Sequence, residues 1–526
     1  MDSIRNSKFK IQNSEFKNTF YKYIPLLLCG FFLVLVIGNA WMGDDIFITL
    51  RTIDNFVHGF GLRWNLLERV QTFTHPLWLF LLTIPYYFTR ETYFTTLAVS
   101  ILSSLVSFVL LLSYLKDIKA KIVTFIILII SHAYIDYSTS GLENPLTHLL
   151  LIVLLILYTK PNPKKTQGNT FWITFVGSLL MLNRLDLGLF VLPIVIHAFI
   201  KRISVKNFMA SLLGLLPILL WEAFSLIYYG FLFPNTFYAK LHTGIALTDS
   251  INQGLIYMAD ALQHHLIVTI VIFFGVVICI FKRDMKSLMM SLSIGLYVLY
   301  IIIIGGDFMT GRFLTAPLIA SIINIYYCIK DISVLEEKQN QLITPALLLL
   351  GMAVFFMRMT EPLIPPNSPS VENMNFLPSG ITNERAFFFK DNGLINVASA
   401  HQKPPYHFWA LQGQAILAKS QEKNETTVVV RDVIGMYGYF AGPKVYIIDP
   451  LALSDPFLAQ RPVPDIHDWK IGHFRRQIPE EYIASRETQS NLLTDPADHE
   501  LLDKLNLITQ GPLFSEARFK AILGVE

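Results

Sequence analysis

The sequence predicts a helical protein that crosses a membrane many times and carries an α/β domain at its C-terminal end. Of its 526 residues, 53% are hydrophobic and 15% are charged, whereas soluble proteins have about 25% charged residues. Apolar runs long enough to cross a bilayer recur up to residue 358, and the chain turns polar and proline-rich from Met359. We therefore expect residues 1–358 to form a transmembrane domain and residues 359–526 to form a soluble domain.

Each transmembrane helix is expected from one apolar run between charged loops. The run Ile24–Ala40 follows basic residues and ends in small ones, so a cleaved signal peptide is the alternative to a first helix. The run 76–88 would form about 20 Å of helix, and we expect it to be interfacial or half inserted. The other runs are 93–115, 122–135, 145–159, 171–183, 187–200, 208–229, 264–281, 287–304, 312–329 and 342–358. The sequence thus predicts about eleven spanning helices, with further helices beside the membrane.

The orientation in the membrane follows from the basic residues, which favour cytoplasmic loops. Five clusters stand at alternate loops: Arg5/Lys8/Lys10/Lys17/Lys22, Lys116/Lys119/Lys121, Lys160/Lys164/Lys165, Lys201/Arg202/Lys206 and Lys282/Arg283/Lys286. With these clusters inside, the loop 41–75 and the segment 359–526 lie outside. The net charge of +3 is small and argues against nucleic acid as a partner.

The C-terminal segment contains two short β-branched stretches. TTVVVRD and KVYIID are typical of buried strands, and the glycine-rich GMYGYFAGP joins them. The three cysteines, Cys29, Cys279 and Cys328, all lie in apolar runs. This placement predicts neither a disulfide framework nor a cysteine-based metal site.

Two adjacent carboxylates, Asp44 and Asp45, follow the first apolar run. Carboxylates next to a bilayer are costly unless they face water or a cation. One could take a proton from an attacking hydroxyl, and the pair could hold a divalent cation such as Mg²⁺, Mn²⁺ or Ca²⁺. The competing interpretation is that they cap a helix that begins near Ile46. The two residues alone leave both interpretations open.

Further charged residues occur in the other outside loops. Arg184 and Asp186 stand between two apolar runs too close for a free loop, so they face the protein interior or pair only with each other. Asp307 and Arg312 lie among glycines, which allow close backbone approach, and arginine suits phosphate oxygens. The alternative there is a helix start capped near Thr310.

Two more loops add one cation and one carboxylate. YYGFLFPNTFYAK is an aromatic loop in which Lys240 is the informative residue, because aromatic belts occur at any bilayer interface. Glu143 directly precedes an apolar run, where it could also stabilise the first turn of a helix. Cations and carboxylates thus gather on one membrane face, which suits a lipid phosphate donor and an acceptor hydroxyl.

Several segments resemble the terminal β-arabinofuranosyltransferase family of the mycobacterial cell wall, within the GT-C superfamily of membrane glycosyltransferases. The resemblance runs from about residue 41 to about residue 475. It is carried by GDDIFITLRTIDNFVHGFGLRWNLLERVQTFTHPLW, TSGLENPL, NRLD, YYGFLFPNTFYAK, GGDFMTGRF, IIDPLALSDPFLA and the IGH that contains His473. Three positions depart from the family pattern: His75 replaces a small hydroxyl residue, Ala452 a glycine and Phe474 an acidic residue.

The resemblance implies a GT-C fold in a bacterial inner membrane and an inverting sugar transfer on its extracytoplasmic face. The implied donor is a polyprenyl-phosphate sugar, decaprenyl-phosphoarabinofuranose in the mycobacterial members, and the acceptor is an envelope glycan, a lipid-linked glycan or a surface protein. It makes Asp44 the catalytic base and Asp45 a supporting or cation-binding residue. Arg184, Lys240 and Arg312 are then expected to hold the donor phosphate, supported by Glu143, Asp186, Asp307, His75 and His473. A lipid-linked flippase or transporter and an envelope phosphotransferase remain the alternatives.

Overall fold

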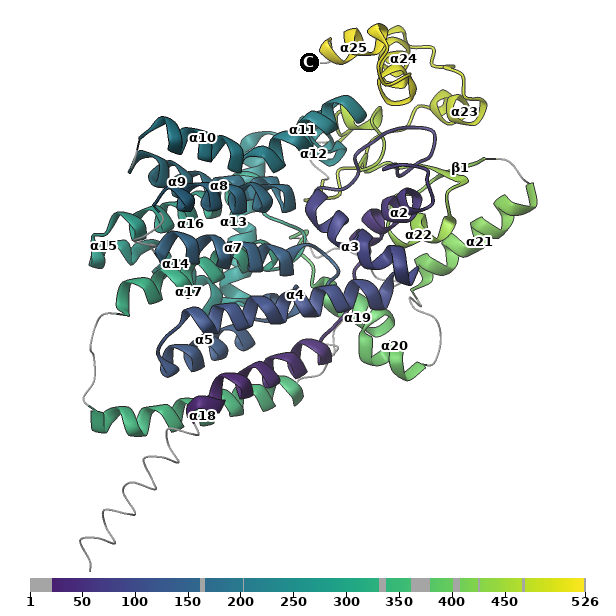
Figure 1. The fold of residues 1–526 in the computed structure, drawn as a ribbon. Coiled ribbons are helices and arrows are strands. Elements are labelled where there is room, and N and C mark those ends of the chain that lie inside the picture. The colour runs from purple at the N-terminus through teal and green to yellow at the C-terminus, as the bar shows by residue number, and fades with distance from the viewer. Residues whose placement is uncertain are drawn as a thin grey trace, which may run out of the picture.

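The protein is a stack of apolar helices joined at one end to a polar part made from the first loop and the C-terminal segment (Figure 1). This computed structural model describes residues 21–160, 166–201, 203–330, 337–360, 379–400, 407–423, 426–465 and 469–524. The proline-rich linker expected after Met359 and several of the basic residues expected inside fall outside these ranges.

All twelve apolar runs contain helix over most of their length. The first is Tyr21–Gly38. The next are α3 (Pro76–Thr89), α4 (Tyr93–Tyr114), α5 (Ile118–Ile130), α7 (Asn144–Thr159), α8 (Thr166–Asn183) and α9 (Gly188–Ile200). They are followed by α14 (Leu266–Val277), α16 (Met285–Ile303), α17 (Thr315–Ile329) and α18 (Glu337–Thr360). The remaining run, 208–229, is bent by 51° between α10 (Val205–Gly214) and α11 (Leu216–Tyr228).

Short elements break or extend several of these helices. They are α6 (His132–Asp136), α15 (Cys279–Lys282) and the 3₁₀ turns η1 (Leu185–Leu187) and η2 (Arg312–Leu314). The helix α13 (Leu247–His264) was not expected from the sequence, and it meets the α14–α15 segment at 114°. Its apolar residues recur at helical spacing, as in Leu247, Ile251 and Leu255, but polar residues separate them, so no apolar run marks the helix.

The outward surface of the helix stack is apolar, as a membrane requires. Phe281, Phe88 and Leu220 are 79%, 77% and 65% exposed, whereas Ser104, Ser287 and Asn324 are buried between helices. Asn324 there donates to the hydroxyl oxygen of Ser291 at 3.0 Å. Lipid can cover an exposed phenylalanine but cannot satisfy a polar group, so polar groups pair inside the stack.

The helices support a protein that spans a membrane several times. Within the described residues, four helices are long and apolar enough to cross, or six if each bent pair counts as one span. Five further apolar helices, α3 among them, have 10–17 residues. The exact number of eleven spans and the half insertion of α3 stay predictions. The first helix lies beside α18, where the rings of Phe31 and Phe355 stack at 4.7 Å (Figure 1).

The C-terminal segment contains both predicted strands. β1 (Thr427–Val430) pairs in parallel with β2 (Val445–Ile448), with Thr427 opposite Val445, and α22 (Met436–Ala441) connects them. The rest of the described segment is helical: α19 (Glu384–Asn392), α20 (Leu394–Ala400), α21 (Phe408–Lys423), η4 (Leu458–Gln460), α23 (Glu480–Thr488), α24 (Pro496–Gln510) and α25 (Glu516–Leu523). An extended α/β sheet domain, and a domain boundary at residue 358, stay predictions.

The first outside loop and the C-terminal segment pack against each other. The loop contains α2 (Asp45–Val57), which lies beside α22 (Figure 1). Arg51 is 2% exposed and donates to three backbone carbonyls, those of Trp64 at 3.0 Å, Gly438 at 2.8 Å and Val445 at 2.7 Å. Asn65 exchanges two hydrogen bonds with the backbone of Ile447 in β2. These contacts fix the C-terminal segment against the loop that contains Asp44.

Candidate active site

A single cavity of about 1530 Å³ opens where the helix stack meets the first loop and the C-terminal segment. Ten residues were singled out from the sequence, and all ten line it. They are Asp44, Asp45, His75, Glu143, Arg184, Asp186, Lys240, Asp307, Arg312 and His473. The fold therefore brings residues from six separate segments of the chain to one place.

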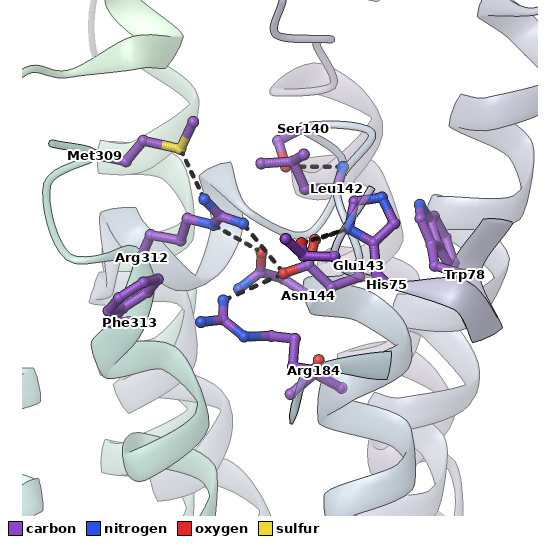
Figure 2. Close-up of polar contacts among 12 residues, drawn as sticks. His75, Trp78, Ser140, Leu142, Glu143, Asn144, Arg184, Met309, Arg312 and Phe313 are labelled. Carbon is purple, nitrogen blue, oxygen red and sulfur yellow. Dashed lines mark hydrogen bonds and ion pairs between the residues drawn. The ribbon is translucent and has the colours of Figure 1, made fainter. Parts of the chain in front are cut away.

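Glu143 is the centre of the charged cluster in this cavity (Figure 2). Its Oε1 lies 3.2 Å from Arg184 Nη1 and 3.1 Å from Arg312 Nη2, and its side chain is 1% exposed. Arg312 Nε also donates to Asn144 Oδ1 at 3.4 Å. Burial alone would raise the pKa of Glu143. Its interactions with Arg312, His75 and Arg184 outweigh burial and lower the pKa to about 2. Glu143 is therefore ionised, and it does not cap its helix with its side chain.

The two arginines are anchored from different sides. Arg184 donates to both carboxylate oxygens of Asp186, at 3.1 and 2.7 Å, and Asp186 also accepts from the Tyr297 hydroxyl at 2.9 Å. Arg312 Nη1 lies 3.6 Å from Asp307 Oδ2. Arg184 thus does not pair with Asp186 alone, and η2 begins after Gly311 without a side-chain cap from Thr310. Both guanidinium groups are held next to one another at the cavity wall.

His75, in the first outside loop, contacts the carboxylate of Glu143. Its Nδ1 lies 3.3 Å from Glu143 Oε2, and its Nε2 lies 2.8 Å from the Thr49 hydroxyl. Burial lowers the pKa of His75 to about 4, although Glu143 opposes the shift, so the ring is neutral at pH 7. A neutral ring with its proton on Nδ1 would face the carboxylate and accept from Thr49.

Asp44 and Asp45 differ in their surroundings although they are adjacent. The carboxylate of Asp44 accepts from the backbone N–H of Gly435 at 3.0 Å and of Met436 at 2.7 Å. Asp44 stands at the N-cap position of α2, as the competing interpretation expects, but its side chain makes no capping hydrogen bond to that helix. Burial raises the pKa of Asp44 to about 7, Asp45 adds to the shift, and the two amide donors oppose it.

Asp45 interacts with the charged cluster and with Glu384 of the C-terminal segment. Burial raises its pKa, and the charges of Arg312 and Lys240 oppose that shift. Within the described part of the chain, no salt bridge or hydrogen bond engages the Lys240 ammonium, which is therefore available to an anionic ligand. His473 lines another part of the cavity. Its ring packs edge-on against the ring of Phe308, with 4.8 Å between the two ring centroids.

Three carboxylates in the cavity were not expected from the sequence, those of Glu222, Asp432 and Glu384. Glu384 belongs to α19. Burial raises its pKa well above the usual range, and the charges of Asp45, Asp44 and Asp307 add to this shift. The only sequence signal is the charged pair Glu384–Arg385 soon after the linker, which no local pattern connects to residue 44. Among the residues that the structure describes, there is no group of three or more His, Cys, Asp or Glu side chains that could hold a metal.

The cavity also has an apolar wall. It is formed by membrane-side residues that include Leu185, Trp221, Leu232, Phe237, Leu247 and Ile303. Aromatic residues of the C-terminal segment, Trp409 and Trp469, line another part. Cations, carboxylates and a hydrocarbon-lined wall in one cavity suit an amphiphile with an anionic head.

The fold of the chain is of the GT-C type, and its cavity combines basic and acidic side chains with an apolar wall. The arrangement of the chain matches ArnT from Cupriavidus metallidurans, solved bound to undecaprenyl phosphate, with a TM-score of 0.50 and 12% identity over 85% of this chain and 89% of that one. The apo structure of the same protein matches with a TM-score of 0.49. No family model matches the chain.

In sequence, the chain is similar to a terminal β-(1→2)-arabinofuranosyltransferase of Mycobacterium tuberculosis. The two are 26% identical over 534 aligned positions, which cover 85% of this chain and 82% of the relative. The resemblance drawn from the sequence motifs is thereby confirmed. The protein is a multi-pass membrane enzyme that transfers a glycosyl group.

Proposed function

We propose that the protein transfers arabinofuranose from a polyprenyl-phosphate donor to a glycan or other glycoconjugate of the cell envelope, with inversion at the anomeric carbon. The observation that carries the proposal is the shared cavity, in which Asp44 and three basic residues lie together with an apolar wall. The sugar is that of the similar mycobacterial enzyme, and the lipid class is that bound in the ArnT structure. The basic clusters support an active site on the extracytoplasmic face of the inner membrane.

Arg184, Arg312 and Lys240 are proposed to hold the phosphate of the donor. The arginines are already placed side by side by Glu143, so little conformational entropy is lost when they bind the two free phosphate oxygens. Lys240 adds an ammonium that has no ion pair among the described residues. The isoprenoid chain would lie along the wall that contains Trp221 and Phe237. The same cations stabilise the charge that develops on the phosphate as it leaves.

Asp44 is proposed as the general base. A base works best when its pKa lies near the working pH, and burial raises the pKa of Asp44 to about 7. It would take the proton from the acceptor hydroxyl as the oxygen attacks the anomeric carbon opposite the phosphate. The bond to the phosphate oxygen breaks in the same step, so the configuration inverts and the proton ends on Asp44.

Asp45 is proposed to support this step, alone or with a divalent cation. Such a cation is proposed to be held between Asp45 and the donor phosphate. Mg²⁺ commonly binds in this way, through one or two carboxylates and substrate phosphates.

The experiment that tests the proposal is turnover by the purified protein in lipid nanodiscs. Decaprenyl-phosphoarabinofuranose and an arabinan oligosaccharide serve as substrates, and mass spectrometry identifies the product. Addition of one pentose to the oligosaccharide, with release of decaprenyl phosphate, supports the proposal. Transfer of a phosphate-bearing group, or movement of intact donor across the bilayer without product, would instead identify a phosphotransferase or a flippase.

A further inference from the structure

Residues of the first outside loop hold α22 at its amino end and in its middle. Asp44 accepts from the N–H groups of Gly435 and Met436, which lie 391 and 392 positions further along the chain. Arg51, two turns along α2, donates to the carbonyl of Gly438 in α22 at 2.8 Å. A carboxylate at the amino end of α22 complements the dipole of that helix.

Residue 435 has no room for a side chain. A Cβ atom built on Gly435 would lie 2.1 Å from the backbone oxygen of Asp44 and 2.4 Å from its Oδ2. The first of these contacts is with backbone, which cannot rotate away. The close approach of the two backbone segments, around Asp44 and around Gly435, therefore needs glycine at this position.

The two amides act on different oxygens of the same carboxylate. Gly435 donates to Oδ2 and Met436 donates to Oδ1, so neither oxygen can turn away without losing a bond. A carboxylate can accept about four hydrogen bonds. Lone pairs of Asp44 therefore remain for the hydroxyl group of the substrate that receives the sugar. Hydrogen bonds from two amides also favour the ionised form, which is the form that a general base requires.

We propose that Gly435 and the backbone N–H of Met436 are positioning groups for the carboxylate of Asp44, so that the C-terminal segment completes the active site. The inference rests on the proposed role of Asp44 as the base. It assigns the segment around α22 to the reaction itself, in addition to any part it has in binding the acceptor. A displacement of about 1 Å at a catalytic group can cost about 100-fold in rate.

The first test is Gly435→Ala, with Gly295→Ala in α16 as the matched control. A Cβ at residue 295 meets only Val276 Cγ1, at 4.0 Å, and Gly295 does not line the cavity. We expect Gly435→Ala to lower kcat about 100-fold while KM for the donor changes less than about threefold. The donor phosphate is bound elsewhere, by Arg184 and Arg312, so donor affinity should survive.

The second test removes one hydrogen bond without adding an atom. An amide-to-ester replacement at residue 436 deletes the N–H group that donates to Asp44 Oδ1. It is made with the α-hydroxy analogue of methionine by nonsense suppression. We expect kcat to fall about tenfold, since the carboxylate loses one of the two backbone hydrogen bonds that hold it in place. The acidic limb of the pH–rate profile should move to higher pH, because the N–H group that favoured the ionised carboxylate is gone. A purely structural role would leave that limb in place.

The outcomes separate this inference from the proposed function. If Asp44→Asn is inactive but the Gly435 and ester variants keep wild-type kcat and pH profile, the positioning role is refuted and the base assignment stands. If Asp44→Asn keeps full activity, both are refuted. If Gly435→Ala aggregates on extraction from the membrane while Gly295→Ala does not, the ester variant alone is the test. A lower kcat with a shifted acidic limb then supports the positioning role, and wild-type kcat and pH profile refute it.

Discussion

Arg184 and Arg312 converge on one oxygen atom, Glu143 Oε1, at 3.2 and 3.1 Å (Figure 2). Two guanidinium groups repel each other, and the carboxylate between them keeps them together at the cavity wall. The ring of Phe313 lies beside both, 4.5 Å from the Arg184 Cζ and 5.8 Å from the Arg312 Cζ. The pair is thus prepared for an anion before any ligand arrives.

Replacing one arginine should weaken donor binding. In Arg312→Lys the charge remains but the planar fork is lost, so hydrogen bonds to the phosphate and to Glu143 cannot both form. We expect KM for the donor to rise about 10- to 100-fold, consistent with about 1.5–3 kcal/mol for hydrogen bonds to charged groups. Initial-rate kinetics measure this, with Arg461→Lys, which pairs with Asp498 outside the cavity, as the control. An unchanged KM would remove Arg312 from the phosphate site.

Neutralising the central carboxylate should have the opposite effect on anions. Glu143→Gln keeps the size of the side chain but adds one net positive charge beside the two arginines. We expect decaprenyl phosphate, the released product, to inhibit about tenfold more strongly, which corresponds to about 1.4 kcal/mol. Inhibition constants measure this. Weaker inhibition would mean that Glu143 acts mainly by holding the arginines in position.

The pH dependence of turnover should follow Asp44. The base must be ionised to accept a proton, and burial raises the pKa of this group to about 7. Below that pH the protonated form dominates, so kcat should fall about tenfold per pH unit and level off above it. Glu143, with a pKa lowered to about 2, stays ionised across this range and does not contribute. A limb near pH 4 would point to a carboxylate with an ordinary pKa instead.

Metal dependence should appear only with the donor. If Asp45 and the donor phosphate share a divalent cation, EDTA lowers turnover and Mg²⁺ restores it, whereas donor-free protein titrated with Mg²⁺ gives no binding heat. Asp45→Asn should abolish the response to added Mg²⁺. Full turnover in EDTA would assign the phosphate to the three basic side chains alone.

The membrane helices could be predicted well from the sequence because lipid selects residues locally. Every residue on the outside of such a helix must be apolar, so the run itself marks the element, as in α4 and α16. The breaks were less visible. The bend between α10 and α11 interrupts the helix at Leu215 within one continuous apolar run, so hydropathy carries no sign of it.

The residues lining the cavity could be predicted because charge is rare and costly at a membrane boundary. Their partners could not. Asp44 was assigned to a helix cap or to catalysis, but its hydrogen bonds go to residues 435 and 436, far along the chain. Glu384 was missed for the same reason, since only the folded chain brings α19 beside Asp45. Local patterns show which residues need a partner, and the fold decides which partner they have.

The most direct test of the account is the turnover of Asp44→Asn, purified in nanodiscs with decaprenyl-phosphoarabinofuranose and an arabinan acceptor. Asparagine keeps the size of the side chain but cannot accept the proton. Binding of decaprenyl phosphate is measured in parallel, and it should stay within about threefold of wild type because the basic residues are intact. The account predicts that pentose transfer falls at least about 100-fold, within the range that a general base contributes. Transfer at the wild-type rate would contradict it.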